Sequence, residues 1–200
     1  KFPTLLKILL VGKPVMKKQE VLETFVEISK LAKKEGPMAI EKKANEMTDP
    51  FFRSTLILVA DGMNADVIAE IVESDIRQME ERHRSGAQIF AQAGMYAPTL
   101  GVLGAVIGLI AALGNLSDID KLGHSIAAAF VATLLGIFTG YVCWHPFANK
   151  LKQISAAEVE IKKMILEGAL ALQTGASSVI IESKLQAFIP VSERVAVNER

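Results

Sequence analysis

The chain has 200 residues, half of them hydrophobic, and its 22 lysines and arginines balance 22 aspartates and glutamates to a net charge of zero. This balance excludes the strong basic excess of many nucleic-acid-binding proteins. A single cysteine, Cys143, excludes an intramolecular disulfide, and the sequence contains no zinc-ligand spacing, phosphate loop or nucleophile elbow. Nearly all charges lie before Ser85 or after Asn149, which indicates that a soluble part and a membrane part share the chain.

The first residues, KFPTLLKILL, predict a short amphipathic helix at a membrane surface, with lysines that reach towards water. The chain starts without methionine and without a signal peptide. We therefore expect that Lys1 is not the native first residue.

A soluble helical domain follows from Lys17. Apolar residues recur at helical spacing up to the glycine-proline pair at 36–37, which predicts the end of a first helix. A second short helix is expected over 38–47. Residues 49–50, Asp-Pro, then cap a third helix that ends near Gly62.

A long helix is expected from Asn64, a good N-cap residue with Asp66 in the first turn behind it. No proline or glycine occurs between Ala65 and Gly86, and the apolar residues of this segment share one face. The helix is expected to continue into the membrane as a rod of about 45 residues, or roughly 70 Å at about 1.5 Å per residue.

Two long uncharged stretches predict two transmembrane helices. Asp, Glu, Lys and Arg are absent between Arg84 and Asp118 and again between Lys121 and Lys150. Each stretch exceeds the roughly 20 apolar residues that cross a bilayer. Buried helices of a large soluble core are the alternative, but they keep a polar stripe that neither stretch has.

Small residues are spaced for close contact between these spans. Gly104 and Gly108 stand four residues apart, as do Gly136 and Gly140, so that two backbones can approach each other. Neither span holds a carboxylate. If ions cross the membrane here, another chain must supply the acidic group.

Flanking charges predict the topology. Arg82 and Arg84 precede the first span, and Lys150 and Lys152 follow the second, whereas the connecting loop carries more acid than base. Because lysine and arginine favour the cytoplasmic side, both soluble parts are expected in the cytoplasm.

The last part of the chain predicts two more helices, one ending near Gly175 and one running from a cap at Ser177 to about Pro190. The predicted organisation is an interfacial helix at 1–12, a cytoplasmic helical domain at 13–90, a transmembrane helix at 91–114, a periplasmic loop at 115–124, a second transmembrane helix at 125–148, and cytoplasmic C-terminal helices and tail at 149–200.

The polar and kinking residues of the spans have ordinary structural interpretations. Thr133 is expected to return its hydroxyl to the carbonyl one turn back, and Pro98 and Pro146 to shape the helices. His145 beside Trp144 is typical of a membrane interface. Two kinks at one depth would also form a flexible collar between the spans and the cytoplasmic domain.

Several motifs, however, closely resemble the MotA family of flagellar motor stator subunits. They are AGMYAPTLGVLGAVIG at 93–108, LGH at 122–124 with ATLLG at 132–136, WHPFANKL at 144–151, and FIP at 188–190. The resemblance covers essentially the whole chain. It implies an all-α membrane protein with two further N-terminal spans, which are absent from this chain and would precede Lys1.

The resemblance also implies the function. In the family, a ring of such chains, expected to be a pentamer, surrounds a pair of MotB-like chains that supply a membrane aspartate and a peptidoglycan anchor. Ion flow through the channel becomes torque on the rotor protein FliG. The chain is then a multi-pass protein of the bacterial inner membrane with no enzymatic activity, no cofactor and no metal site.

Four positions of the spans match functional positions of the family. Pro98 and Pro146 match prolines of the conformational coupling, and Thr133 matches a polar position of the ion path. Ala105 stands where sodium-driven relatives carry a second threonine. Because sodium requires oxygen ligands that replace its water, this alanine predicts a proton-driven unit.

The rotor contact is transferred from the family only to the nearest charges. The family's cytoplasmic cation position holds an apolar residue near Ile57, so the role falls to Arg53 and Asp61. Both residues also fit solvated surface charges.

Three other functions remain open. An ExbB- or TolQ-like protein would use similar proton-coupled mechanics to energise the outer membrane. A passive membrane scaffold would use Thr133 and the prolines only for shape. An intramembrane enzyme fits least, because no nucleophile, base or metal cluster can be named.

Overall fold

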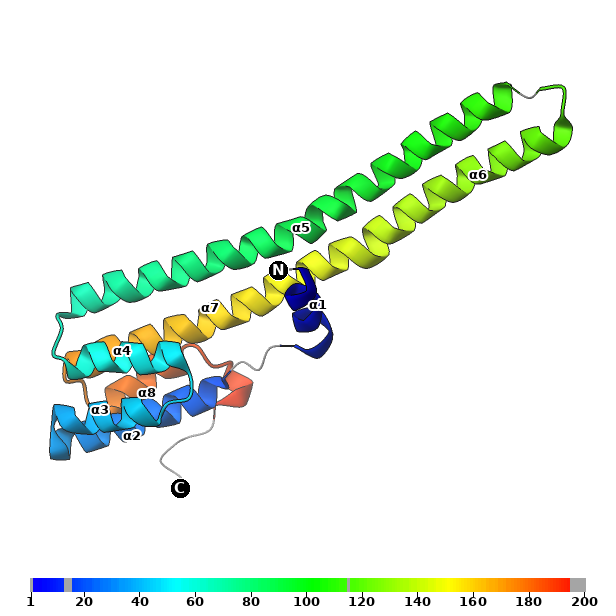
Figure 1. Ribbon diagram of the computed structural model, residues 1–200. Coiled ribbons are helices and arrows are strands. Elements are labelled where there is room, and N and C mark those ends of the chain that lie inside the picture. Colours follow the sequence, from blue (N-terminus) through cyan, green and yellow to red (C-terminus); the bar gives the residue numbers. More distant parts are fainter. Residues whose placement is uncertain (1, 13–15, 115, 195–200) are drawn as a thin grey trace. The chain divides into compact units, whose positions relative to one another are not determined.

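The computed structural model describes residues 2–12, 16–114 and 116–194, and all regular elements among them are helices (Figure 1). This confirms the all-α fold class. The elements are α1 (Phe2–Val11), α2 (Lys18–Glu35), α3 (Pro37–Glu46), α4 (Pro50–Ala60), α5 (Ala65–Leu113), α6 (Ile119–Phe138), the π-helix η1 (Thr139–Trp144), α7 (His145–Gln173), α8 (Ser178–Gln186) and the 3₁₀ turn η2 (Val191–Glu193).

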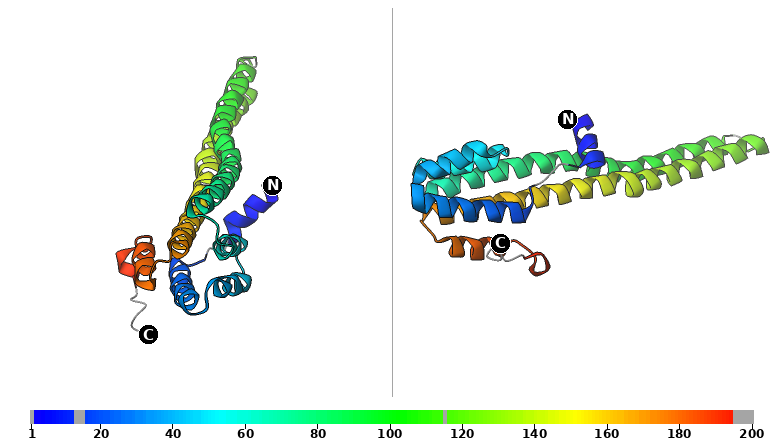
Figure 2. Two further views of the ribbon diagram at one scale, coloured as in Figure 1. Left: turned by 90° about the vertical axis from the view of Figure 1, so that its left-hand side faces the viewer. Right: turned by 90° about the horizontal axis from the view of Figure 1, so that it is seen from below.

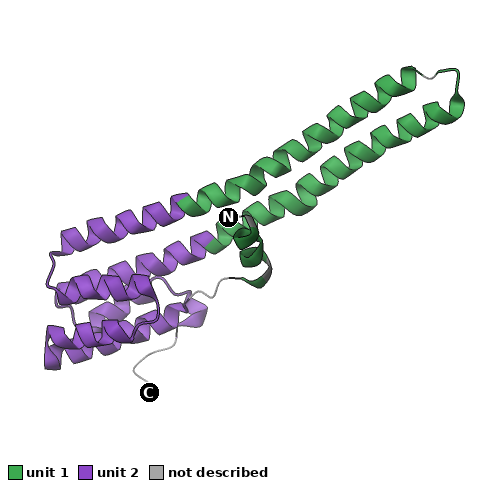
Figure 3. Ribbon diagram, in the orientation of Figure 1, with its two compact units in different colours: residues 1–12, 82–154 green, residues 13–81, 155–200 purple. Residues whose placement is uncertain are grey.

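The chain forms two compact units, each built from two separate parts of the sequence (Figure 3). Unit 1 comprises residues 1–12 and 82–154, and unit 2 comprises residues 13–81 and 155–200. Both α5 and α7 contribute one part to each unit. The predicted domain boundaries at the membrane surface stay a prediction.

Local capping explains where the helices of unit 2 begin and end. Asp49 accepts a hydrogen bond from the Phe52 backbone N–H at 2.8 Å, which starts α4. Asn64 accepts one from the Asp66 N–H at 3.1 Å before α5. Gly36 ends α2 at φ +77°, a conformation that favours glycine. The predicted caps and the stop are therefore confirmed.

The core of unit 2 joins helices that lie on both sides of the spans in the sequence. Phe25 of α2 and Phe52 of α4 are fully buried, with ring centroids 5.0 Å apart. Ile68 of α5 packs in the same cluster, as do Met164 of α7 and Ile181 of α8. The core of unit 2 therefore requires the segment after residue 155.

The tightest contact in this core gives a stability prediction. A Cβ on Gly168 would lie 2.6 Å from two atoms of the buried Phe25 ring. We expect Gly168→Ala to cost about 1–3 kcal/mol, as overpacking a filled core does, and Phe25→Leu to recover part of that loss in the double variant. Thermal unfolding of the detergent-solubilised protein measures both effects, and an unchanged transition for Gly168→Ala would contradict the packing.

In unit 1, α1 packs against α5 and α7. Leu9 is buried in a cluster whose other members are Ala87, Phe90, Ala148 and Leu151. The helical prediction for this segment is confirmed, and its apolar face packs on protein. Small residues of α5 and α7 allow that approach, because the Leu5 side chain lies directly over Gly86, 3.2 Å from where a Cβ would stand. The place of α1 at a membrane surface stays a prediction.

Lys150 fixes the end of this helix. Its Nζ donates a 2.7 Å hydrogen bond to the carbonyl oxygen of Leu9, within the last turn of α1. A cation at a helix C-terminus satisfies carbonyls that lack an intrahelical partner.

Candidate ion-path site

Two helices are long and apolar enough to cross a membrane, by length and composition: α5, and the continuous helix of α6, η1 and α7 over Ile119–Gln173. In their most apolar windows, only 11% and 17% of the residues are buried. The core helix of a soluble protein would be mostly buried. The exposed side chains here are large and apolar, for example Leu100, Ile107, Phe130 and Leu134, so that lipid or other membrane helices must cover them.

The backbones of the two helices touch along a seam of glycines within unit 1. A Cβ on Gly136 would lie 2.6 Å from the carbonyl oxygen of Ala97 and 2.9 Å from the Cα of Gly101. A Cβ on Gly101 would lie 2.8 Å from the carbonyl oxygen of Ala132. The views in Figures 1 and 2 agree that these parts of α5 and α6 run side by side.

The glycines predicted from their spacing take part in this seam. A Cβ added to Gly108 would lie 2.9 Å from the Cβ of Ala129. A Cβ added to Gly104 would lie 3.1 Å from the Cβ of Ala132. Sequence reasoning missed Gly101, although it stands three residues before Gly104 and seven before Gly108, on the same helix face.

Thr133 lies on the seam. It is half-buried, its Cα is 3.3 Å from where a Cβ on Gly101 would stand, and its hydroxyl donates to the carbonyl oxygen of Ala129 at 3.2 Å. This is the back-bond expected from the sequence. A hydroxyl that donates one hydrogen bond keeps its lone pairs for a water molecule or a cation.

Ala105 is half-buried at a similar depth. Its neighbour Gly104 faces Ala132, which precedes Thr133 in the chain. Thr133 itself lies against Gly101, which is four residues, or about one helical turn, before Ala105.

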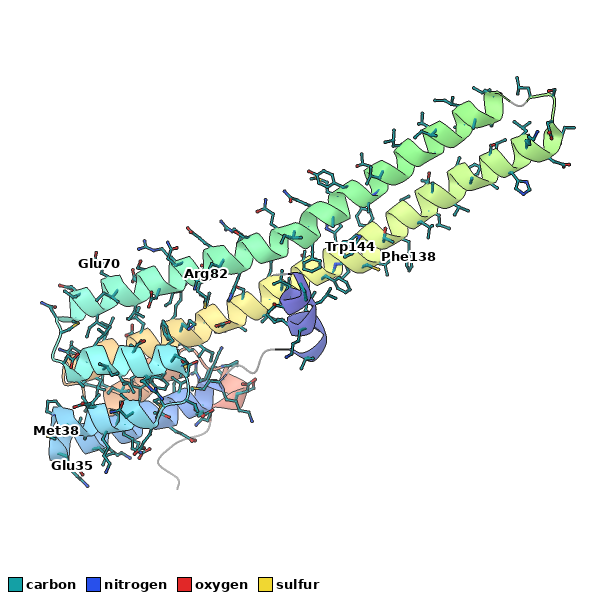
Figure 4. The ribbon with its side chains drawn as sticks, in the orientation of Figure 1. Glu35, Met38, Glu70, Arg82, Phe138 and Trp144 are labelled. Carbon is teal, nitrogen blue, oxygen red and sulfur yellow. The ribbon has the colours of Figure 1, made fainter. Side chains whose placement is uncertain are left out.

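Pro98 and Pro146 have different surroundings. The Pro98 ring lies 2.9 Å from where a Cβ on Gly140 would stand, so it packs into the gap that this glycine leaves. Pro146 is exposed as the second residue of α7, directly after the π-helix η1. Phe138 precedes η1 and Trp144 ends it, and both are labelled in Figure 4.

The sequence analysis missed η1, although Pro146 offered a signal for it. A proline ring clashes with the carbonyl four residues earlier in a regular α-helix. A wider π turn immediately before the proline is one way to relieve that clash, and such turns occur mostly as single insertions, often at functional sites.

The turn that joins the two long helices is shorter than predicted. Asp118 caps α6 by accepting a 3.2 Å hydrogen bond from the Lys121 N–H, so that residues 119–124 of the predicted loop are helical. That hydrogen bond, together with the Lys121 ammonium 3.1 Å away, lowers the pKa of the Asp118 carboxyl.

The predicted rotor-contact residues lie in unit 2. Arg53 is exposed on α4 and donates to the carbonyl oxygen of Met47 at 2.7 Å, while Asp61 is exposed directly after α4. Ile57, near which the sequence comparison with the family put a cation position, is half-buried against the core of unit 2. Over residues 2–12, 16–114 and 116–194, the structure gathers no three His, Cys, Asp or Glu side chains in the way a metal site requires.

Two apolar helices in backbone contact, with large uncovered apolar faces, define a class of protein: a membrane protein whose spans pack against lipid or further helices. The chain belongs to the MotA/TolQ/ExbB proton channel family, whose model matches residues 43–164.

Individual relatives agree over nearly the whole chain. Motility protein A of Bacillus subtilis (strain 168) is 47% identical over 200 residues, which are 100% of this chain and 74% of the relative. The structure of the flagellar MotAB stator complex from Bacillus subtilis contains a chain with TM-score 0.89 and 48% identity, covering 97% of this chain and 76% of that one. The structure of C. jejuni MotAB gives TM-score 0.91, 30% identity, and coverage of 98% and 76%.

These similarities confirm the central predictions from the sequence. The chain is a stator subunit of the flagellar motor, it is an ion-channel component and not an enzyme, and it lies in the bacterial inner membrane.

Proposed function

We propose that copies of this chain form a ring, a pentamer, around the membrane helices of a MotB-like partner, and that the partner's carboxylate completes an ion path at Thr133. Both similar solved structures are described as MotAB complexes, which supports such a partner. The observation that carries the proposal is the seam itself. It places a hydroxyl between two touching helices in a segment without any carboxylate.

The uncovered faces of the spans support the oligomer. On α6, large apolar side chains point away from the seam on several sides, and Phe130, Leu134 and Phe138 are each more than half exposed. Neighbouring copies, the partner's helix and lipid together supply enough apolar surface to cover these faces.

We propose protons as the transported ion. At the depth of the path, Thr133 supplies a hydroxyl and Ala105 supplies none. A sodium ion that loses its hydration shell needs several oxygen ligands, whereas a proton needs one titratable group and a chain of water molecules.

The test is ion flux through the complex with its MotB-like partner, reconstituted in lipid vesicles with any channel-closing segment of the partner removed. We expect acidification of the vesicles to follow an imposed pH gradient and to stay unchanged when potassium replaces sodium. Vesicles without protein report the background leak. Flux that stops on removal of sodium at fixed pH would contradict the proton assignment, and no flux under any gradient would contradict the channel.

The prolines and the charged residues complete the proposal. Two prolines would transmit a change at the partner's carboxylate to α7. They are Pro98, which packs against Gly140, and Pro146, which follows η1. Arg53 and Asp61, exposed on unit 2, would then engage charged residues of the rotor protein FliG.

A further inference from the structure

The π-helix changes which residues of the second long helix face α5. On that helix the seam contacts come at Ala129, Ala132, Gly136 and Gly140, in steps of three or four residues. An α-helix would place the next contact three or four residues after Gly140. Trp144, four residues on, packs against Phe90 of α5 with ring centroids 6.2 Å apart, and His145, five residues on, lies against Gly94 of the same helix.

The backbone shows the cause of this shift. The N–H of His145 donates to the carbonyl oxygen of Gly140, a bond across five residues that is the signature of a π turn. Across this wider turn two consecutive side chains, Trp144 and His145, both contact α5, and the imidazole comes to lie against Gly94.

The imidazole lies against bare backbone. A Cβ on Gly94 would lie 3.1 Å from each of three atoms of the His145 ring, so only a glycine leaves room for it. The ring of Tyr141 lies beside it, with a centroid distance of 5.3 Å. His145 is half-buried, so the ring is held between the helices and still reaches water.

The two described neighbours of this ring, Gly94 and Tyr141, carry no charge. On its own helix it faces Tyr141, and the nearest cation, Lys150, donates to the carbonyl oxygen of Leu9. On α5 it faces Gly94, and that helix carries no charged side chain after Arg84. From α1, the charged side chain is Lys7, which is exposed.

We infer that His145 is the proton-accepting residue at the cytoplasmic end of the ion path. Imidazole is the side chain whose ordinary titration lies between pH 5 and 8. Among residues 122–149, the other histidine is His124, at the opposite end of the span, where its Nδ1 lies 3.2 Å from the carbonyl oxygen of Asp120. The third histidine, His83, lies on α5 before the uncharged stretch, so His145 is the histidine of the uncharged stretches on the cytoplasmic side of Thr133.

The step conserves protons and needs no further reactant. A ring nitrogen of neutral His145 takes a proton from a hydronium ion on the Thr133 side, which leaves neutral water there, and the resulting imidazolium gives a proton to water on the cytoplasmic side, which leaves neutral His145 again. Twelve residues separate Thr133 from His145, about 18 Å along a helix at about 1.5 Å per residue. Water must therefore carry the proton over that interval.

This inference rests on the proposed function, and two variants of His145 test it in the same vesicle assay. His145→Phe keeps an aromatic ring over Gly94 and beside Tyr141, and His145→Gln keeps a polar side chain, but neither takes up a proton in this pH range. We expect both to lower proton flux by about tenfold or more, as loss of a positioned proton-transfer group does. We also expect both to flatten the dependence of the flux on cytoplasmic-side pH between about 5 and 8.

A control and a rescue make the result specific. His124→Gln removes the other histidine of this segment and should leave flux and pH profile as in the parent complex. His145→Glu restores a titratable group and should recover part of the flux, with a pH profile moved to more acidic values because a carboxyl ordinarily titrates near pH 4.

The possible outcomes separate this inference from the proposed function. If the parent complex conducts and His145→Phe or His145→Gln conducts with the same pH profile, the role of His145 is wrong and the channel stands. If the parent complex does not conduct, the channel proposal fails and the inference fails with it. Size-exclusion chromatography of each complex confirms that the variants being compared are assembled.

Discussion

Gly136→Ala is expected to abolish ion flux and motility, because it adds one methyl group at the closest contact of the two apolar helices. The new Cβ would stand 2.6 Å from the Ala97 carbonyl oxygen and 2.9 Å from the Gly101 Cα. Both are backbone atoms, so no side chain can move aside. Overpacking of this kind ordinarily costs about 1–3 kcal/mol, and here the two helices must separate or rotate, which displaces Thr133 on the same seam.

The measurement is the amount of assembled complex in membrane extracts, together with flux in vesicles. Gly123→Ala is a matched control, because it lies in the same helix, α6, and a Cβ there would meet nothing within 4 Å. We expect the control to assemble and conduct like the parent protein. A Gly136→Ala complex with normal yield and flux would show that the helices are not in backbone contact in the membrane.

Thr133→Val is expected to preserve the assembly and to reduce proton flux by one to two orders of magnitude. Valine has nearly the shape of threonine, so the seam stays packed, but the substitution removes the hydroxyl. A hydrogen bond to a charged group contributes about 1.5–3 kcal/mol, which corresponds to about 10- to 100-fold in rate at about 1.4 kcal/mol per tenfold.

Thr99→Val is the matched control for this change. The Thr99 hydroxyl makes the same kind of back-bond, to the carbonyl oxygen of Met95 at 3.1 Å, but Thr99 is exposed on α5. Swimming speed and vesicle flux should fall for Thr133→Val and stay near the parent value for Thr99→Val. Equal flux in the two variants would assign Thr133 a role in shape alone.

Most of the helices were predictable because their ends carry local signals. Two helix starts are marked by capping residues, Asp49 before Pro50 and Asn64, and one helix end is marked by Gly36. Each of these signals depends only on backbone groups within one helical turn. The long helix was predictable because neither proline nor glycine interrupts 65–85. The membrane spans were predictable because uncharged stretches of this length have few alternatives in soluble proteins.

The features that the sequence did not reveal depend on contacts between distant segments. One such feature is the surface that the apolar face of α1 packs against. The same leucines would suit contact with lipid and contact with the cluster around Phe90, so the sequence does not distinguish the two. The π turn η1 is another such feature, because one inserted residue leaves the helix propensity of the segment unchanged. That single residue brings His145 against α5 together with Trp144, so the candidate proton acceptor was visible only in three dimensions.

The divided core of unit 2 has a consequence for biogenesis. Phe25 and Phe52 leave the ribosome early, but Met164 and Ile181, which complete their burial, follow only after both apolar helices have been synthesised. A nascent chain thus holds an unfinished cytoplasmic core while its spans enter the translocon. Membrane integration thereby becomes a checkpoint for folding: a chain arrested before residue 155 leaves these phenylalanines without their partners and open to chaperones and proteases.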